Sequence, residues 1–69
     1  MTQRDYRLIM AAIDNCENRE KQTCEDFCKL RPEGRNRFEE HRDIFLFATM
    51  MLRFEIERMI KNDEERLKA

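Results

Sequence analysis

The chain has 69 residues, of which 42% are charged, and its net charge is −1. A chain of this length forms one domain at most, and a single core below about 70–80 residues rarely supplies more than about 3–5 kcal/mol. The near-neutral charge provides no overall field that would attract nucleic acid or an anionic membrane. The first ten residues lack the apolar core of a signal peptide, and the apolar run from Ile44 is too short to cross a bilayer. We therefore expect no membrane partner.

The composition predicts long helices. The chain contains no valine, one glycine and one proline, and isoleucine is its only β-branched apolar residue. Such a mixture is poor in strand and turn formers and rich in helix formers. The three cysteines are an odd number, which fits free thiols in a reducing compartment better than a disulfide framework. We therefore expect a cytoplasmic protein.

A first helix is predicted over about residues 3–30. Thr2 and Asp5 have the spacing of a capping box at its start. Residues 17–23 are wholly polar, yet a heptad pattern continues through them. A continuous helix is the favoured interpretation, and the alternative is a break near residues 15–18 with a new capping box at Thr23 and Asp26. The two heptad columns are Tyr6, Ile13, Glu20 and Phe27, and Ile9, Cys16, Thr23 and Leu30.

A loop over residues 31–35 and a second helix from about 36 to 61 or beyond complete the predicted hairpin. Pro32 pushes Arg31 out of the helical region, Gly34 tolerates a left-handed turn, and Asn36 is a candidate helix cap. The tail beyond residue 61 has little to bury and is expected to fray. The fold class is thus an all-α helical hairpin within one domain, 1–69. The second helix has a seam of Phe38, Phe45, Leu52 and Met59, with His41, Ala48 and Glu55 or Ile56 between them.

The hairpin cannot bury all of its own apolar surface. If the chain reverses near Glu33, antiparallel neighbours have numbers that add up to about 66, so the polar stretch 17–23 faces residues 43–49. Residues 44–54 are also apolar around most of the helix, and such a helix must be covered on several sides. We expect a homodimeric four-helix bundle, and the alternative is a three-helix monomer with a broken first helix. The predicted interface is Phe38, Ile44, Phe45, Phe47, Ala48, Met51, Leu52, Phe54 and Met59.

Three residues are weak candidates for a metal site. Cys24 and Cys28 lie one helical turn apart, and the hairpin would place His41 across the loop from them. Two thiolates and an imidazole can bind zinc, but structural zinc sites usually have cysteines at shorter spacing. The favoured interpretation is that both cysteines are small apolar core residues and that His41 packs or caps. We expect no metal and no cofactor.

Two pairs of acids carry the only likeness to a known family. Glu17-x-x-Glu20 and Glu40-x-x-Asp43 lie on two helices. This arrangement resembles the Mg²⁺-binding motif of all-α nucleotide pyrophosphohydrolases of the MazG type, which are also helical-bundle oligomers. The resemblance covers these four residues and implies Mg²⁺-dependent phosphate chemistry. The ordinary alternative, which we favour, is that they are solvated acids paired with neighbouring bases.

The predicted loop is locally basic and is a candidate phosphate contact. Lys29, Arg31, Arg35 and Arg37 are offset there only by Glu33. Such a cluster can bind nucleic acid, although no aromatic residue is free beside it for stacking on bases. The favoured interpretation is an ordinary solvated end of a hairpin.

These patterns together predict a small protein that is not an enzyme. We expect a protein–protein interaction module, acting as a regulator, adaptor or inhibitor, that associates through the apolar middle of the second helix. Its partner is a second copy, another protein, or both. The alternatives are a nucleic-acid-binding regulator that uses the basic loop and a Mg²⁺-dependent nucleotide pyrophosphohydrolase.

Overall fold

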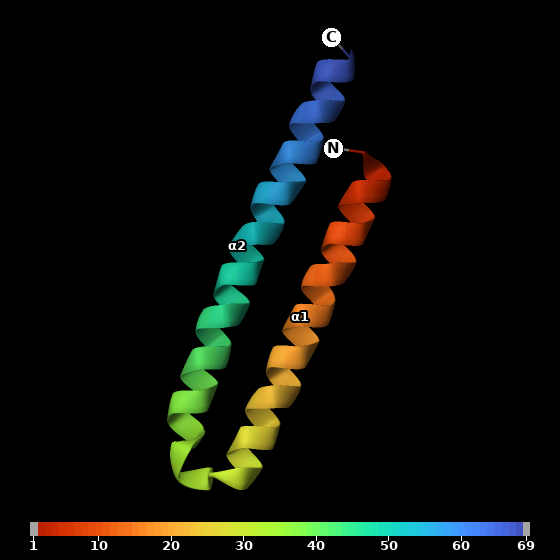
Figure 1. The fold of residues 1–69 in the computed structure, drawn as a ribbon. Coiled ribbons are helices and arrows are strands. Elements are labelled where there is room, and N and C mark those ends of the chain that lie inside the picture. The colour runs from red at the N-terminus through yellow and green to blue at the C-terminus, as the bar shows by residue number, and fades with distance from the viewer. Residues whose placement is uncertain (1, 69) are drawn as a thin grey trace.

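The computed structural model describes residues 2–68, so Met1 and Ala69, the ends of the predicted domain 1–69, lie outside the described residues. The elements are α1 (Gln3–Leu30), a short 3₁₀ helix η1 (Pro32–Gly34) and α2 (Arg35–Lys68). Figure 1 shows the two long helices running antiparallel side by side. The predicted all-α helical hairpin is confirmed. Within the described range, no helix is long and apolar enough to cross a membrane.

Helix α1 begins where its capping residue predicts and is unbroken. The backbone N–H of Asp5 donates to Oγ1 of Thr2 at 3.1 Å, which satisfies one of the free donors at the helix N-terminus. The helix continues through the polar residues 17–23, so the second capping box at Thr23 is not used. It ends at Leu30, and the next residue, Arg31, has a φ of −138° and a ψ of 77°, outside the helical region that a following proline disfavours.

The turn differs from the prediction in two details. Helix α2 begins at Arg35 directly after η1, so Asn36 lies inside the helix and does not cap it. No residue in the described range has a positive φ, so Gly34 adopts no left-handed turn. A Cβ atom at Gly34 would instead lie 2.8 Å from Cε2 of Phe38. A side chain at this position would therefore displace the Phe38 ring, which packs against the turn.

The register of the two helices agrees with the predicted pairing. The rings of Phe27 and Phe38 lie 5.5 Å apart between centroids at the closed end. At the open end, the side chain of Gln3 donates to Glu64 at 2.6 Å. The start of α1 and the last turns of α2 therefore lie at the same end of the hairpin, where α2 continues past the start of α1 (Figure 1).

The core between the helices is small, and its seam in α1 differs from the predicted heptad columns. Cys16 and Leu30, which were expected on the seam, are exposed, Leu30 by 78%. A nearly straight helix has about 3.6 residues per turn, so a strict heptad column drifts about 20° per repeat away from its neighbour. Ile13 and Cys24, which are eleven residues apart, stay on the inner side instead. The buried apolar residues in the described range are Ile13, Cys24, Cys28, Ile56 and Ile60.

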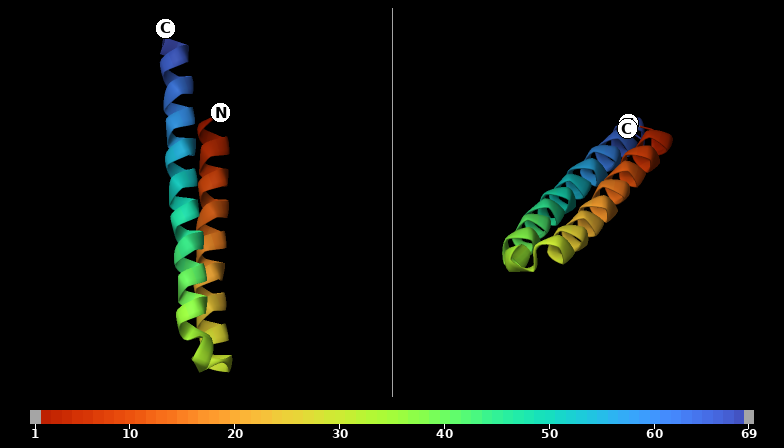
Figure 2. Two further views of the ribbon diagram at one scale, coloured as in Figure 1. Left: turned by 90° about the vertical axis from the view of Figure 1, so that its left-hand side faces the viewer. Right: turned by 60° about the horizontal axis from the view of Figure 1, so that its bottom comes forward.

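The hairpin is elongated and one layer thick. Its Cα radius of gyration is 16.4 Å, whereas a compact domain of this length has a radius of about 11 Å. Figure 2 shows two helices with nothing covering either broad side of the pair. Most apolar side chains therefore have no helix of their own chain to pack against.

The few buried side chains should carry much of the stability. We expect Ile56→Ala to lower the free energy of unfolding by about 2–4 kcal/mol, because it leaves a cavity where Ile56 is only 6% exposed. Urea denaturation followed by circular dichroism measures the change. The matched control is Leu30→Ala, which removes an exposed side chain and should change the stability by less than about 0.5 kcal/mol. Equal losses in both variants would contradict this description of the core.

Candidate functional site

A central polar cluster joins the two helices at mid-length. It consists of Asp14 and Glu17 from α1 and Thr49 and Arg53 from α2. The hydroxyl of Thr49 donates to Oε2 of Glu17 at 2.6 Å, and the guanidinium of Arg53 forms ion pairs with both carboxylates. The side chains of Glu17 and Arg53 are only 18% and 23% exposed. The cluster therefore satisfies the polar groups that the hairpin places between its helices.

The cluster shifts the titration of its central carboxylate. The hydrogen bond from Thr49 and then that from Arg53 stabilise the charged form and lower the pKa of Glu17 below its usual range. Both oxygens of Glu17 are engaged, Oε2 by Thr49 and Oε1 by Arg53. We therefore interpret this carboxylate as a structural contact between helices.

The zinc candidates separate into two environments. Cys24 and Cys28 are buried and lie next to each other, and burial followed by the hydrogen bond with Cys28 raises the pKa of the Cys24 thiol. His41 was expected to pack or cap, but its side chain is 76% exposed. Its Nδ1 lies 2.9 Å from Oε1 of Glu20. Among the described residues, no three His, Cys, Asp or Glu side chains form a group that could hold a metal.

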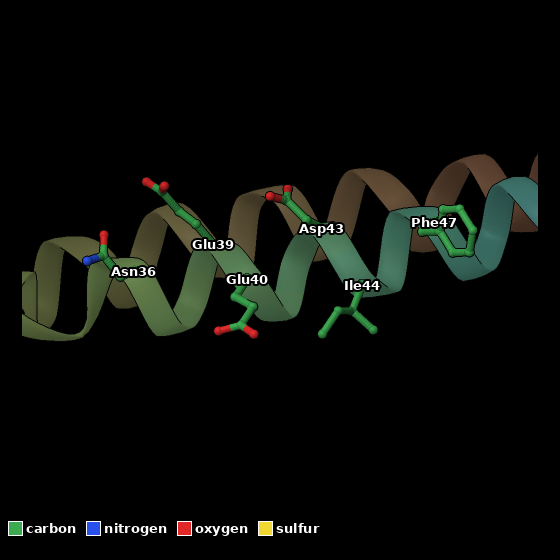
Figure 3. A pocket seen from close by; sticks show the side chains of 6 residues that line it. All are labelled: Asn36, Glu39, Glu40, Asp43, Ile44 and Phe47. Atoms are coloured by element: carbon green, nitrogen blue, oxygen red, sulfur yellow. The ribbon is translucent and has the colours of Figure 1, made fainter.

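The four acids that resemble the MazG motif face different ways. Glu17 and Glu20 make their contacts with α2. Glu40 and Asp43 belong instead to a shallow hollow on the surface of α2, where Figure 3 shows Glu40 and Ile44 pointing away from the ribbon in the same direction. One hairpin therefore does not bring the four carboxylates together. The hollow is lined by Asn36, Glu39, Glu40, Asp43, Ile44 and Phe47.

The basic residues gather at the closed end, as the sequence predicts. Arg31 lies 4.0 Å from Glu33, and Arg35 lies 3.3 Å from Glu39. Both pairs are exposed, and ion pairs of this kind are individually weak. Lys29 and Arg37 are exposed as well. The closed end thus presents four cations to solvent.

Helix α2 carries a row of exposed apolar side chains, which we call the outer stripe. Thr49 and Arg53 turn toward α1, and a step of two residues rotates a helix by about 200°. Phe47 and Met51, two positions on either side of Thr49, therefore point away from α1. The outer stripe comprises Ile44, Phe47, Met51 and Phe54, which are 64%, 61%, 47% and 57% exposed.

A second apolar surface, which we call the lateral row, lies beside the outer stripe. Leu52 and Met59 are about half exposed, whereas Phe38 and Phe45 are partly covered. The row continues onto α1 through Phe27, which shares a small hollow with Phe38 and Cys24. The predicted seam of α2 thus lies on one broad side of the hairpin. The lateral row comprises Phe38, Phe45, Ala48, Leu52 and Met59.

Sequence reasoning missed the central polar cluster, although its signal was present. Thr49 and Arg53 are the only polar residues within the run from Ile44 to Phe54. Their spacing of four places both on one side of the helix, and the predicted register sets that side against Asp14 and Glu17. Two polar residues with this spacing inside an apolar run mark one side of the helix, and the structure shows that this side faces α1.

Comparison with known proteins adds no relationship, because no protein family, curated protein or solved structure matches the chain.

The lowered pKa of Glu17 predicts a specific loss of stability in acid. The pKa of Glu17 in the folded protein lies below its unfolded value of about 4.3. The contribution of Glu17 to the free energy of unfolding is therefore complete above that unfolded value and is lost as the pH falls through the folded pKa. We expect Glu17→Gln to weaken the decline of the unfolding free energy between about pH 5 and pH 3. Urea denaturation at several pH values measures this slope. Glu25→Gln, an exposed change on α1, serves as the control, and identical slopes in the two variants would contradict the role of Glu17.

Proposed function

We propose that this protein is a small protein–protein interaction module without enzymatic activity, and that it acts by covering a partner surface with the apolar middle of α2. The observation that carries the proposal is the exposure of the outer stripe and the lateral row on one helix. Contiguous exposed apolar surface in a small protein marks an interaction site. A regulator, adaptor or inhibitor works in this way.

The size of the exposed surface also supports association. The chain exposes 5856 Å², whereas a compact monomer of 8.5 kDa exposes about 4,700 Å². The excess of about 1,200 Å² exceeds the roughly 800 Å² that each partner covers in a standard interface. Full burial of a large apolar side chain contributes about 1.5–3 kcal/mol, so four of them offset much of the association cost of about 4–15 kcal/mol.

The proposed assembly is a homodimeric four-helix bundle made of two hairpins. Such bundles bury the apolar side of each helix against neighbours from both chains. The reducing cytoplasm is the proposed setting, because the buried thiols of Cys24 and Cys28 stay free there.

Binding of nucleic acid at the closed end is the second candidate, favoured by the gathering of Lys29, Arg31, Arg35 and Arg37 there. In this case the affinity for duplex DNA or RNA should fall steeply with salt and should drop by about tenfold or more when the three arginines become glutamine. Fluorescence anisotropy at 50 and 200 mM salt measures both effects. Binding that is absent at 50 mM salt, or equal in wild type and triple variant, would exclude this function.

The interaction module predicts self-association that depends on α2. The double variant Phe47→Asp and Leu52→Asp puts a charge on both apolar rows, and we expect it to sediment as a monomer where the wild type sediments as a dimer. The matched control is the double variant Leu8→Asp and Leu30→Asp, which changes two leucines of α1 that are 60% and 78% exposed. Circular dichroism confirms that each variant is helical. A wild type that stays monomeric at high concentration would contradict the homodimer.

A further inference from the structure

The outer stripe is bounded by one acidic and one basic residue. Glu40 lies four positions before Ile44, and Arg58 lies four positions after Phe54, so both continue the same side of α2. Glu40 makes no hydrogen bond or ion pair within residues 2–68. Arg58 is bonded to Glu55 at 2.6 Å within its own helix and remains 67% exposed, so its guanidinium has donors left. The stripe thus ends in opposite charges that face solvent.

The bounded stripe has an internal symmetry about Thr49. Glu40 and Arg58 are equally far from this residue, as are Ile44 and Phe54, and Phe47 and Met51. A two-fold axis between two outer stripes, at the level of Thr49, therefore places the acid of one copy against the base of the other. The same axis places apolar residues against apolar residues. Such self-complementarity arises only when the two copies of α2 run antiparallel. In a parallel pair, Glu40 would face Glu40 of the other copy.

We infer that a second copy of this chain occupies the outer stripe, with the two α2 helices antiparallel, a two-fold axis between the stripes at the level of Thr49, and Glu40 of each copy paired with Arg58 of the other. This inference rests on the proposed interaction function and specifies its partner and register. The contact covers four exposed large apolar side chains of α2. It also gives Glu40 a cation, which none of residues 2–68 supplies in the single hairpin. Because the outer stripe lies opposite α1, the two α1 helices flank the central α2 pair, and the four helices of this dimer form one layer instead of the closed bundle described above.

A charge-swap cycle tests the register. Glu40→Arg alone sets two arginines against each other at both ends of the stripe, and Arg58→Glu alone sets two acids against each other. Each should weaken dimerisation by about tenfold or more, because like charges in an interface are strongly unfavourable. The double variant Glu40→Arg with Arg58→Glu restores opposite charges and should recover to within about threefold of wild type. Sedimentation equilibrium gives the dissociation constants.

The controls separate this inference from the proposed function. Arg19→Glu and Glu25→Arg are matched charge reversals at exposed positions of α1 and should leave dimerisation unchanged. If the wild type dimerises but the double variant does not recover, the antiparallel register is wrong while the interaction function stands. If neither single reversal weakens the dimer, the outer stripe is not the contact. A monomeric wild type would overturn both.

Cross-linking provides a second test that does not depend on charge. In a background of Cys16→Ser, which removes the exposed native thiol, Ile44→Cys and Phe54→Cys are made as separate single variants. Two copies of position 44 lie about 15 Å apart along the axis in the antiparallel dimer, too far for a disulfide. Mixing the two variants under oxidation should therefore give a covalent dimer that neither variant gives alone. Covalent dimers in the separate samples would indicate a parallel pair and overturn the inference.

Discussion

The pairing of Arg53 with Asp14 and Glu17 is the interaction on which the rest of the hairpin depends. The apolar contact between the helices is small and would tolerate sliding, because few side chains are buried between them. The central polar cluster does not tolerate it. A shift by one residue would move Arg53 and Thr49 away from Glu17 and leave a largely covered carboxylate without partners, which is strongly unfavourable. The cluster therefore fixes the register.

The same cluster decides which side of α2 is turned outward. Thr49 and Arg53 must face α1, so the residues on the opposite side of the helix must face solvent. In this stretch, those residues are large and apolar. The exposed outer stripe is thus the direct consequence of placing the two polar residues of an apolar run on the inside. This exposed apolar surface is the observation on which the proposed association rests.

Several features of the fold could be predicted because they depend on neighbours in sequence. Thr2 caps α1 through a contact with Asp5, and Pro32 ends the helix through its effect on Arg31. The details that failed depend on contacts across the turn or along the whole helix. A side chain at Gly34 would displace the ring of Phe38, and Cys16 leaves the seam because a straight helix does not follow a heptad repeat over its full length. His41 is exposed, although its Nδ1 lies close to Glu20 on the other helix.

The sequence by itself determined the two helices, the position of the turn and the pairing of residues across the hairpin, because helix propensity, proline and chain reversal act locally. It also indicated that α2 carries more apolar surface than one partner helix can cover. Only the tertiary structure decided how that surface is divided. The division arises because the contact of Thr49 and Arg53 with α1 fixes the rotation of α2 about its own axis, and a rotation is set by packing and not by the order of residues alone.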